Sequence, residues 1–508
     1  MPFHRPALVL IAGTTGLLLA LTFVQAMSNG RPLGLPPETA AQSEFQACLN
    51  VINSRDFGEI RRFAESHFSK GLREKGMAET LARLSFESTG FVWQGTRESS
   101  PRRFVGILKN KLQETWLDFG VFVSKEAPFM IEGLILSPSG PPAGTLPPPK
   151  LSDTEIVEKL KTTGKAYEDA GIFSGTVLLA RGSDLLFAEA YGPADRESRV
   201  PASLETRFNI ASLGKMFTAV AIAQLADEGR LSLDDRVGRF LETDWIRKQT
   251  AESVTIRHLL THTSGLGDFF EKAKSSRRAE FLTLEDYRPL IALETLSFTP
   301  GSRFLYSNSG FFLLGVIVEK ITGQPYEDYL RTKIFTPAGM NGMAFESEID
   351  EKGAPRPGFA LNYILDFSED RVLWKQPPWA GIRMKGTPAG GAKATIRDIW
   401  KFAHAFMENK LVRQEMRDLM IKAKPEMNAP GYGYGFEVGR GPAGSVVGHR
   451  GGDRGMTALL HVYPDRGLIF IVLSNTSNGT FLMNSRFVEG LTGEHFRLQP
   501  EPKKSFDF

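Results

Sequence analysis

The chain has 508 residues, of which 42% are hydrophobic, as in ordinary globular proteins long enough for more than one domain. Lys and Arg total 61 and Asp and Glu total 58, so the near-zero net charge of +3 gives no reason to expect a nucleic-acid partner. The one cysteine, Cys48, excludes an intramolecular disulfide and is a poor metal site by itself, so we expect it to be a small buried residue on a helix.

Residues 1–26 have the layout of a secretory signal. His4 and Arg5 give a weakly positive start, an apolar run covers residues 7–24, and small residues end the run near Ala26. The run is also close to the length that spans a bilayer, so an uncleaved membrane tether through residues 7–24 is the competing interpretation. Both interpretations predict an exported protein, periplasmic or secreted and with or without an inner-membrane anchor. The sequence does not indicate an oligomeric state.

Two stretches rich in Gly and Pro, residues 30–38 and 137–150, predict linkers, because proline lacks an N–H and fixes φ. Between them, residues 39–136 begin with apolar residues at helical spacing and continue with alternating segments. This order predicts a small α+β domain, and it resembles folds of the nuclear-transport-factor-2 type. No catalytic constellation lies in it, so we expect a binding or spacer module.

The remaining domain, residues 151–496, opens with a helical stretch and a predicted hairpin at residues 173–191. Ser212 follows at the start of an apolar predicted helix, and Lys215 lies three residues later on the same helical face. A serine hydroxyl needs a base to take its proton, and a lysine can act as that base when burial lowers its pKa. By itself this spacing favours a structural interpretation, in which an N-cap serine precedes a surface lysine.

Two later motifs favour the catalytic interpretation. Tyr306 and Asn308 stand in the sequence YSN, before an apolar predicted helix. His449 stands in the sequence GHRGG of residues 448–452, on a predicted strand that two further strands follow. This ordered triplet resembles that of the serine β-lactamase and penicillin-binding protein superfamily. The stretches at residues 256–266 and 388–391 resemble its class C-like branch.

The resemblance implies a mixed α/β (α+β) fold of the β-lactamase/transpeptidase type. An antiparallel sheet from the first and last strands is flanked by helices, beside a helical region. It also implies roles for individual residues. Ser212 is acylated, Lys215 accepts its proton, and Tyr306 shuttles a proton after neighbouring cations have lowered its pKa. Asn308 binds Lys215 and the substrate, and Gly451 and Gly452 belong to the substrate strand, where the N–H of Gly452 and that of Ser212 form the oxyanion hole.

His449 and Arg450 depart from the Lys-Thr-Gly sequence of the β-lactamases in this branch. A histidine is neutral much of the time near pH 7, which favours esters, amides or small peptides over β-lactams or D-Ala-D-Ala substrates. Arg450 carries a permanent charge, but on an extended strand its side chain points away from that of His449. The expected protein is a serine hydrolase that acts through an acyl-enzyme on an amide, ester or β-lactam bond of a small molecule or peptide. Its expected type is a carboxylesterase, a D-aminopeptidase or a DD-carboxypeptidase.

We expect no cofactor or metal ion. His258 and His262 have helical spacing but no third ligand nearby, so core or capping roles are favoured. Thr395 and Asp398 predict a helix cap, and residues 431–435 predict a glycine–aromatic turn. The alternative function is a non-catalytic penicillin-binding-like sensor or binding protein. Such a protein would be expected to have lost Ser212, Lys215 or Tyr306, all of which are present.

Overall fold

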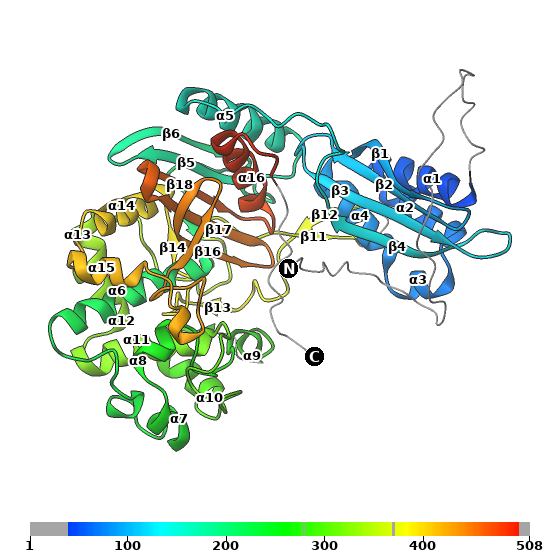
Figure 1. Cartoon of the computed structure of the whole chain (residues 1–508). Coiled ribbons are helices and arrows are strands. Elements are labelled where there is room, and N and C mark those ends of the chain that lie inside the picture. The colour runs from blue at the N-terminus through cyan, green and yellow to red at the C-terminus, as the bar shows by residue number, and fades with distance from the viewer. Residues whose placement is uncertain (1–38, 277, 279, 368–370, 497–508) are drawn as a thin grey trace. The chain divides into compact units, whose positions relative to one another are not determined.

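The computed structural model describes residues 39–276, 278, 280–367 and 371–496 (Figure 1). The predicted signal or anchor at residues 1–26 and the first predicted linker lie outside the described residues. Among the residues that are described, no helix combines the length and apolar character needed to cross a bilayer. The described chain divides into two compact units. One comprises the residues up to Pro148, Leu365–Leu373 and the last residues from His495, and the other comprises Pro149–Ile364 and Trp374–Glu494.

The first unit places four helices before a four-stranded antiparallel sheet in the order β1-β2-β3-β4. Its elements are α1 (Ala40–Ser54), α2 (Phe57–His67), α3 (Lys70–Glu74), α4 (Met77–Ser88), β1 (Phe91–Ser99), β2 (Arg103–Asn110), β3 (Trp116–Val123) and β4 (Ile131–Pro138). The ring of Phe45 on α1 lies 4.8 Å from that of Phe104 in the sheet. Gly106 makes room for this contact, because a Cβ there would come within 2.4 Å of Phe45.

Two details of this unit differ from the sequence prediction. Strand β1 was not predicted, because shifts in its pairing register near Gly95 and between Thr96 and Glu98 interrupt the regular alternation. Strand β4 extends to Pro138, into the predicted second linker, which an edge strand tolerates because its outer side needs no N–H. Cys48 is buried on α1 as expected, and burial raises the pKa of its thiol.

The second unit contains most of the remaining elements. Its helices are α5 (Asp153–Asp169), α6 (Gly214–Asp227), α7 (Lys248–Ser253), α8 (Ile256–Leu260), α9 (Phe270–Lys274), α10 (Arg288–Ile291), α11 (Asn308–Thr322), α12 (Tyr326–Leu330), α13 (Thr336–Ala338), α14 (Ile396–Met407), α15 (Gln414–Met420) and α16 (Gly479–Thr492). The strands that follow β4 are β5 (Gly175–Arg181), β6 (Asp184–Tyr191), β7 (Pro193–Asp195), β8 (Val200–Pro201), β9 (Phe208–Asn209), β10 (Glu280–Phe281), β11 (Ile364–Asp366), β12 (Leu373–Lys375), β13 (Arg383–Met384), β14 (Lys393–Ala394), β15 (Glu437–Gly441), β16 (Gly444–Asp453), β17 (Met456–Tyr463) and β18 (Leu468–Ser474).

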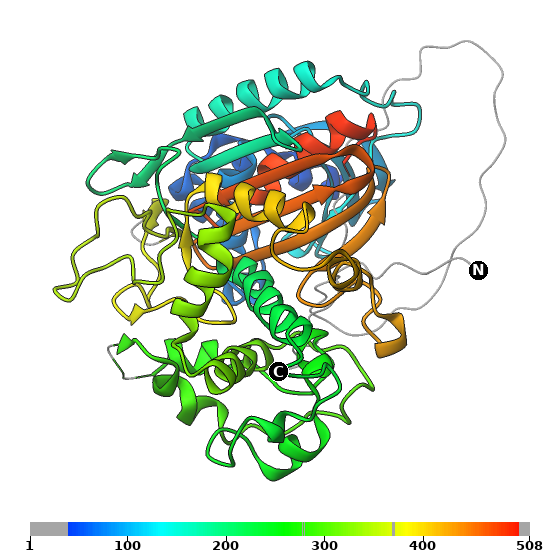
Figure 2. The ribbon, with the colours of Figure 1, turned by 90° about the vertical axis from the view of Figure 1, so that its left-hand side faces the viewer.

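The main sheet of this unit is antiparallel, in the order β15-β16-β17-β18-β5-β6. It joins the first strands to the last ones, because β18 pairs with β5 from Leu468 opposite Arg181 to Ser474 opposite Gly175. This confirms the predicted arrangement of the sheet. Helices α5 and α16 lie over one face, and α14 covers the other (Figure 2). On β18, Phe470 stacks on Phe487 of α16, whereas Ile471 belongs to the core on the opposite face.

Helices α6 and α11 pack against each other in the helical region beside the sheet. Both are apolar nearly all round, which predicts burial, and almost every residue of α6 from Gly214 to Leu225 is buried. The α-helix begins at Gly214, two residues later than Ser212. A single 3-10 turn, Ala211–Leu213, precedes it and holds the serine.

Candidate active site

Ser212 lies where two other chain segments approach the backbone very closely. A Cβ on Gly451 of β16 would come within 2.7 Å of the Ser212 nitrogen, and a Cβ on Gly390 would come within 2.3 Å of the Ala211 oxygen. Glycine is therefore required at both positions for the strand and the loop to close around the serine. Ala211 itself has φ of 44°, a conformation that non-glycine residues rarely adopt and that often marks a functional site.

Lys215 is fully buried, one turn after Ser212, and its Nζ lies 3.1 Å from Ser212 Oγ. The same Nζ donates hydrogen bonds to Asn308 Oδ1 at 2.7 Å and to the Ala389 carbonyl oxygen at 2.6 Å. Burial lowers the pKa of Lys215 to about 7, although the charges of Asp268 and Glu437 act to raise it. The lysine can therefore be an uncharged amine at neutral pH.

The two carbonyl oxygens decide where the lone pair of that amine points. A neutral amine has two N–H groups and one lone pair, and a carbonyl oxygen can only accept a hydrogen bond. With both N–H groups used on Asn308 and Ala389, the lone pair is left for the Ser212 hydroxyl. This arrangement can remove the serine proton, as the sequence motif predicts.

Asn308 is the first residue of α11, where Ser307 caps the helix by accepting the Gly310 N–H at 2.9 Å. The Asn308 side chain also donates from Nδ2 to Asp268 Oδ2 at 2.6 Å. Sequence reasoning missed Asp268, although it lies two residues beyond the recognised stretch at residues 256–266. Its position could have suggested a polar residue at the edge of the site.

Tyr306 lies over Lys215, with the lysine Nζ 4.8 Å from the centre of its ring. Burial raises the pKa of Tyr306 above its usual value, and a hydrogen bond with Ser212 opposes this only in part. The predicted lowering of this pKa by neighbouring cations is therefore wrong. Desolvation of the hydroxyl outweighs the hydrogen bond with Ser212 and the charge of Arg450, which both act to lower the pKa. Tyr306 remains a phenol that can donate a proton.

His449 is buried on β16, and both of its ring nitrogens have partners. Nδ1 lies 2.5 Å from the Arg450 carbonyl oxygen, so it carries the ring proton, because a carbonyl can only accept. Nε2 then accepts the hydroxyl proton of Tyr432 at 2.8 Å. Burial lowers the pKa of His449 to about 4, although Glu437 acts to raise it. The imidazole is thus neutral at pH 7, in line with the reasoning from sequence.

Arg450 is exposed whereas His449 is buried, as alternation along the strand predicts. Its Nε donates to Glu437 Oε2 on β15 at 2.8 Å. Sequence reasoning missed Glu437 as well as Tyr432, which belongs to the predicted turn at residues 431–435. A Cβ on Gly435 would come within 2.3 Å of the Ala219 side chain, so this turn is pressed against α6. The turn at residues 431–435 therefore lies close to the site because of tertiary packing.

The two histidines His258 and His262 have structural roles. His258 and Thr255 form the capping box of α8, and the ring of His262 packs 4.2 Å from that of Tyr306. His262 Nδ1 accepts the Ser307 N–H at 2.9 Å, which places the YSN segment beside Lys215. The capping and core roles predicted for these two histidines are confirmed, as is the cap formed by Thr395 and Asp398. Within the described ranges, no three His, Cys, Asp or Glu side chains gather as a metal site.

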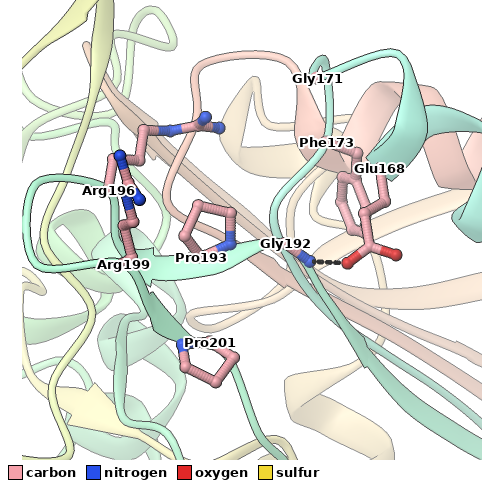
Figure 3. Close-up of a pocket in the computed structure, with 8 residues that line it drawn as sticks. All are labelled: Glu168, Gly171, Phe173, Gly192, Pro193, Arg196, Arg199 and Pro201. Carbon is pink, nitrogen blue, oxygen red and sulfur yellow. Dashed lines mark hydrogen bonds between the residues drawn. The ribbon is translucent and has the colours of Figure 1, made fainter.

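A hollow of about 390 Å³ lies elsewhere in this unit, and its lining includes none of the predicted site residues (Figure 3). Its lining consists of Glu168, Gly171, Phe173, Gly192, Pro193, Arg196, Arg199 and Pro201. The Glu168 carboxylate accepts the Gly192 N–H at 2.7 Å, and the Arg196 guanidinium stacks 4.3 Å from the Trp374 ring.

Comparison with known proteins gives a consistent picture. The family described as Beta-lactamase matches residues 156–489, which include Ser212, Lys215, Tyr306, Asn308 and His449. A penicillin-binding protein of Bacillus subtilis (strain 168) is 32% identical over 336 residues, covering 63% of this chain and 71% of the relative. The esterase EstB of Burkholderia gladioli is 33% identical over 307 residues, covering 54% of this chain and 76% of the esterase.

Among solved structures, a penicillin-binding protein from Bacillus halodurans superposes with a TM-score of 0.55 at 31% sequence identity. The superposition covers 66% of this chain and 98% of the other. The mixed fold with an antiparallel sheet and flanking helices is thus shared with a penicillin-binding protein.

Proposed function

We propose that this chain, which belongs to the beta-lactamase family, is a serine hydrolase that cleaves an ester or amide bond through an acyl-enzyme on Ser212. The family includes penicillin-binding proteins and esterases among the relatives of this chain. The observation that carries the proposal is the position of Lys215. Its Nζ lies 3.1 Å from Ser212 Oγ, with both amine hydrogens directed to carbonyl oxygens.

Acylation would begin with transfer of the Ser212 proton to the uncharged Lys215 amine. The serine Oγ then bonds to the substrate carbonyl carbon, and the carbonyl oxygen becomes an oxyanion. The backbone N–H groups of Ser212 and Gly452 are the proposed donors to that oxygen, and the close approach of Gly451 to Ser212 supports their being neighbours. Preorganised donors of this kind typically stabilise a transition state by about 3 kcal/mol each.

Collapse of the tetrahedral intermediate needs a proton for the leaving group. Tyr306 remains protonated because burial raises its pKa, so its hydroxyl can give that proton and regain one from the Lys215 ammonium. The bond to the leaving alcohol or amine breaks, and the acyl group stays on Ser212. Water then attacks the acyl-enzyme with the same groups in the reverse roles, which releases a carboxylic acid and restores the serine.

The uncharged His449 on strand β16 supports a substrate that places no carboxylate against this residue. With Nδ1 donating to a backbone carbonyl and Nε2 accepting from Tyr432, His449 has no N–H left for such a carboxylate. This favours a carboxylesterase or D-aminopeptidase activity over a DD-carboxypeptidase or β-lactamase activity. The existence of an esterase relative supports the same choice.

We further propose that the protein acts outside the cytoplasm, either released or tethered through residues 7–24. Fractionation of producing cells, followed by N-terminal sequencing of the exported form, distinguishes the two cases. A protein confined to the cytoplasm contradicts the proposal.

The function is tested with p-nitrophenyl acetate and a fluorescent penicillin on the wild type and the Ser212→Ala variant. We expect the wild type to hydrolyse the ester and to gain the mass of one acyl group on Ser212, and we expect the variant to do neither. Ser302→Ala is a matched control, because Ser302 is exposed and outside the site, and it should behave like the wild type.

The outcome separates three activities. A wild type that neither hydrolyses the ester nor forms an adduct contradicts the enzyme proposal and favours a binding protein with the same fold. Hydrolysis of the ester without hydrolysis of a chromogenic cephalosporin supports the esterase or peptidase interpretation. Rapid turnover of both substrates points to a β-lactamase.

A further inference from the structure

We infer that Asp268 is a positioning residue, which holds the Asn308 amide in the one orientation that leaves the Lys215 lone pair on Ser212. The inference rests on the proposed function, because it concerns the same serine. Asp268 lies in the segment between α8 and α9. Among the site residues predicted from sequence, Asn308 is the one to which the Asp268 side chain hydrogen-bonds within the described part of the chain.

The carboxylate fixes the amide because it can only accept hydrogen bonds. Asp268 Oδ2 accepts from Asn308 Nδ2 at 2.6 Å, and Oδ1 accepts from the Phe270 N–H at 2.8 Å. The amide oxygen of Asn308 must then face the other way, toward Lys215 Nζ at 2.7 Å. In the flipped orientation the amide NH₂ would face the lysine and compete with Ser212 for its lone pair.

Asp268 is itself held by a buried carboxylate from another segment. Glu294 accepts the Gly267 N–H at 3.1 Å and the Ser309 hydroxyl at 2.8 Å, so it joins the residue before Asp268 to the residue after Asn308. The Gly267 carbonyl oxygen also accepts the Ser307 hydroxyl at 2.9 Å. These bonds hold the neighbours of Asp268 and of Asn308 together, as is required if one side chain is to position the other.

Asp268 also supplies negative charge to the surroundings of Lys215. The titratable groups that act on Lys215 are Asp268, Glu437, Tyr306, His262 and His449. Burial keeps the last three neutral at pH 7, and Glu437 is bound by Arg450. No cation pairs with Asp268 within the described part of the chain. Loss of its charge should therefore lower the pKa of Lys215 further, because less negative charge remains to favour the ammonium.

The test is the pH dependence of kcat/KM for p-nitrophenyl acetate in Asp268→Asn and Asp268→Ala. In both variants we expect the acid limb to move to lower pH by up to about one unit, because the amine is free at a lower pH. We expect the plateau to fall about 10-fold for the asparagine variant, which keeps one acceptor, and about 100-fold for the alanine variant. A role in folding alone would not move the acid limb.

Glu271→Gln is the matched control for charge. Glu271 is an exposed carboxylate on α9, three residues along the chain, and it pairs with Lys274 instead of Asn308. Removing its charge should leave the acid limb and the plateau at their wild-type values. An acid limb displaced as far as in Asp268→Asn would show that general charge, and not position, controls Lys215, and would overturn the inference.

The Asn308→Ala variant tests whether Asp268 acts through Asn308. In that background, Asp268→Asn should lower the plateau of kcat/KM only a little further, because the amide that Asp268 orients is already absent. Fully multiplicative losses overturn the positioning role. If both Asp268 variants lose their native circular dichroism, Asn308→Ala still breaks the same chain of hydrogen bonds, and an unchanged plateau in that variant overturns the inference.

The two proposals fail in different ways. Full ester turnover by Ser212→Ala overturns the proposed function and the inference together. An inactive Ser212→Ala variant with an acid limb that is unmoved, or moved upward, in folded Asp268→Asn overturns only the inference about Asp268.

Discussion

The two sides of Ser212 each contain a buried base near a carboxylate, yet the two bases differ in pKa. On the helical side, Lys215 contacts Asn308, and Asp268 stands behind the amide. On the strand side, His449 contacts Tyr432, and Glu437 is bound by Arg450. Burial lowers the pKa of Lys215 to about 7 and that of His449 to about 4.

This difference shows how one physical effect gives two chemical results. Desolvation disfavours the charged form of both bases, but lysine starts from a pKa near 10.5 and histidine from one near 6.5. The pKa of the lysine therefore falls in the range where a base can lose and regain a proton at neutral pH. The histidine is uncharged at that pH. The helical side can perform proton transfer, and the strand side shapes what can bind.

Loss of the titrating group on the helical side should have the largest effect. We expect Lys215→Met to lower kcat/KM for p-nitrophenyl acetate by about 1,000-fold, because Tyr306, which also hydrogen-bonds with Ser212, is a phenol whose pKa is raised by burial. In the wild type, kcat/KM should fall as the pH drops below about 7, since the free amine is then protonated. Lys320→Met, at an exposed position on α11, is the control. A Lys215→Met variant that keeps more than a tenth of the wild-type kcat/KM would contradict the assignment of Lys215 as the base.

A charge placed on the strand side should change substrate preference. We expect His449→Lys to increase the rate of acylation by a fluorescent penicillin by about 10-fold, because a charge-assisted hydrogen bond to the penicillin carboxylate becomes available. The ratio of this rate to ester turnover should rise, and Arg450→Lys, which keeps an exposed cation, should leave the ratio unchanged. No change, or a fall, in His449→Lys would contradict the role assigned to the neutral strand side.

The smallest effect concerns the partner of His449. Tyr432→Phe leaves the buried Nε2 acceptor of His449 without a donor, which should lower the free energy of unfolding by about 1–3 kcal/mol in urea titrations at pH 7. Tyr287→Phe is a matched control, because the hydroxyl of Tyr287 is buried and has no hydrogen-bond partner among the described residues. Equal losses in both variants would show that the contact with His449 contributes nothing specific.

Sequence reasoning was accurate where a pattern is local. The spacing of Ser212 and Lys215 correctly predicted that the two side chains lie together. The alternation along β16 correctly predicted the different burial of His449 and Arg450. Thr395 correctly predicted the start of α14. It was inaccurate where burial decides the outcome. The pKa of Tyr306 was expected to fall because a lysine is nearby, but desolvation of the phenol is the larger effect and depends on packing from distant segments.

The sequence by itself determined which residues could carry nucleophilic chemistry, because Ser212, Lys215, Tyr306 and Asn308 occur in motifs whose order and local spacing are visible along the chain. Only the tertiary structure decided which of their atoms act and which partners hold them. Asp268, Tyr432 and Glu437 reach the site through hydrogen bonds with residues 40, 17 and 13 positions away. The physical reason is that a pKa or a lone-pair direction is set by burial and by hydrogen-bond partners, and the fold brings both together from separate parts of the sequence.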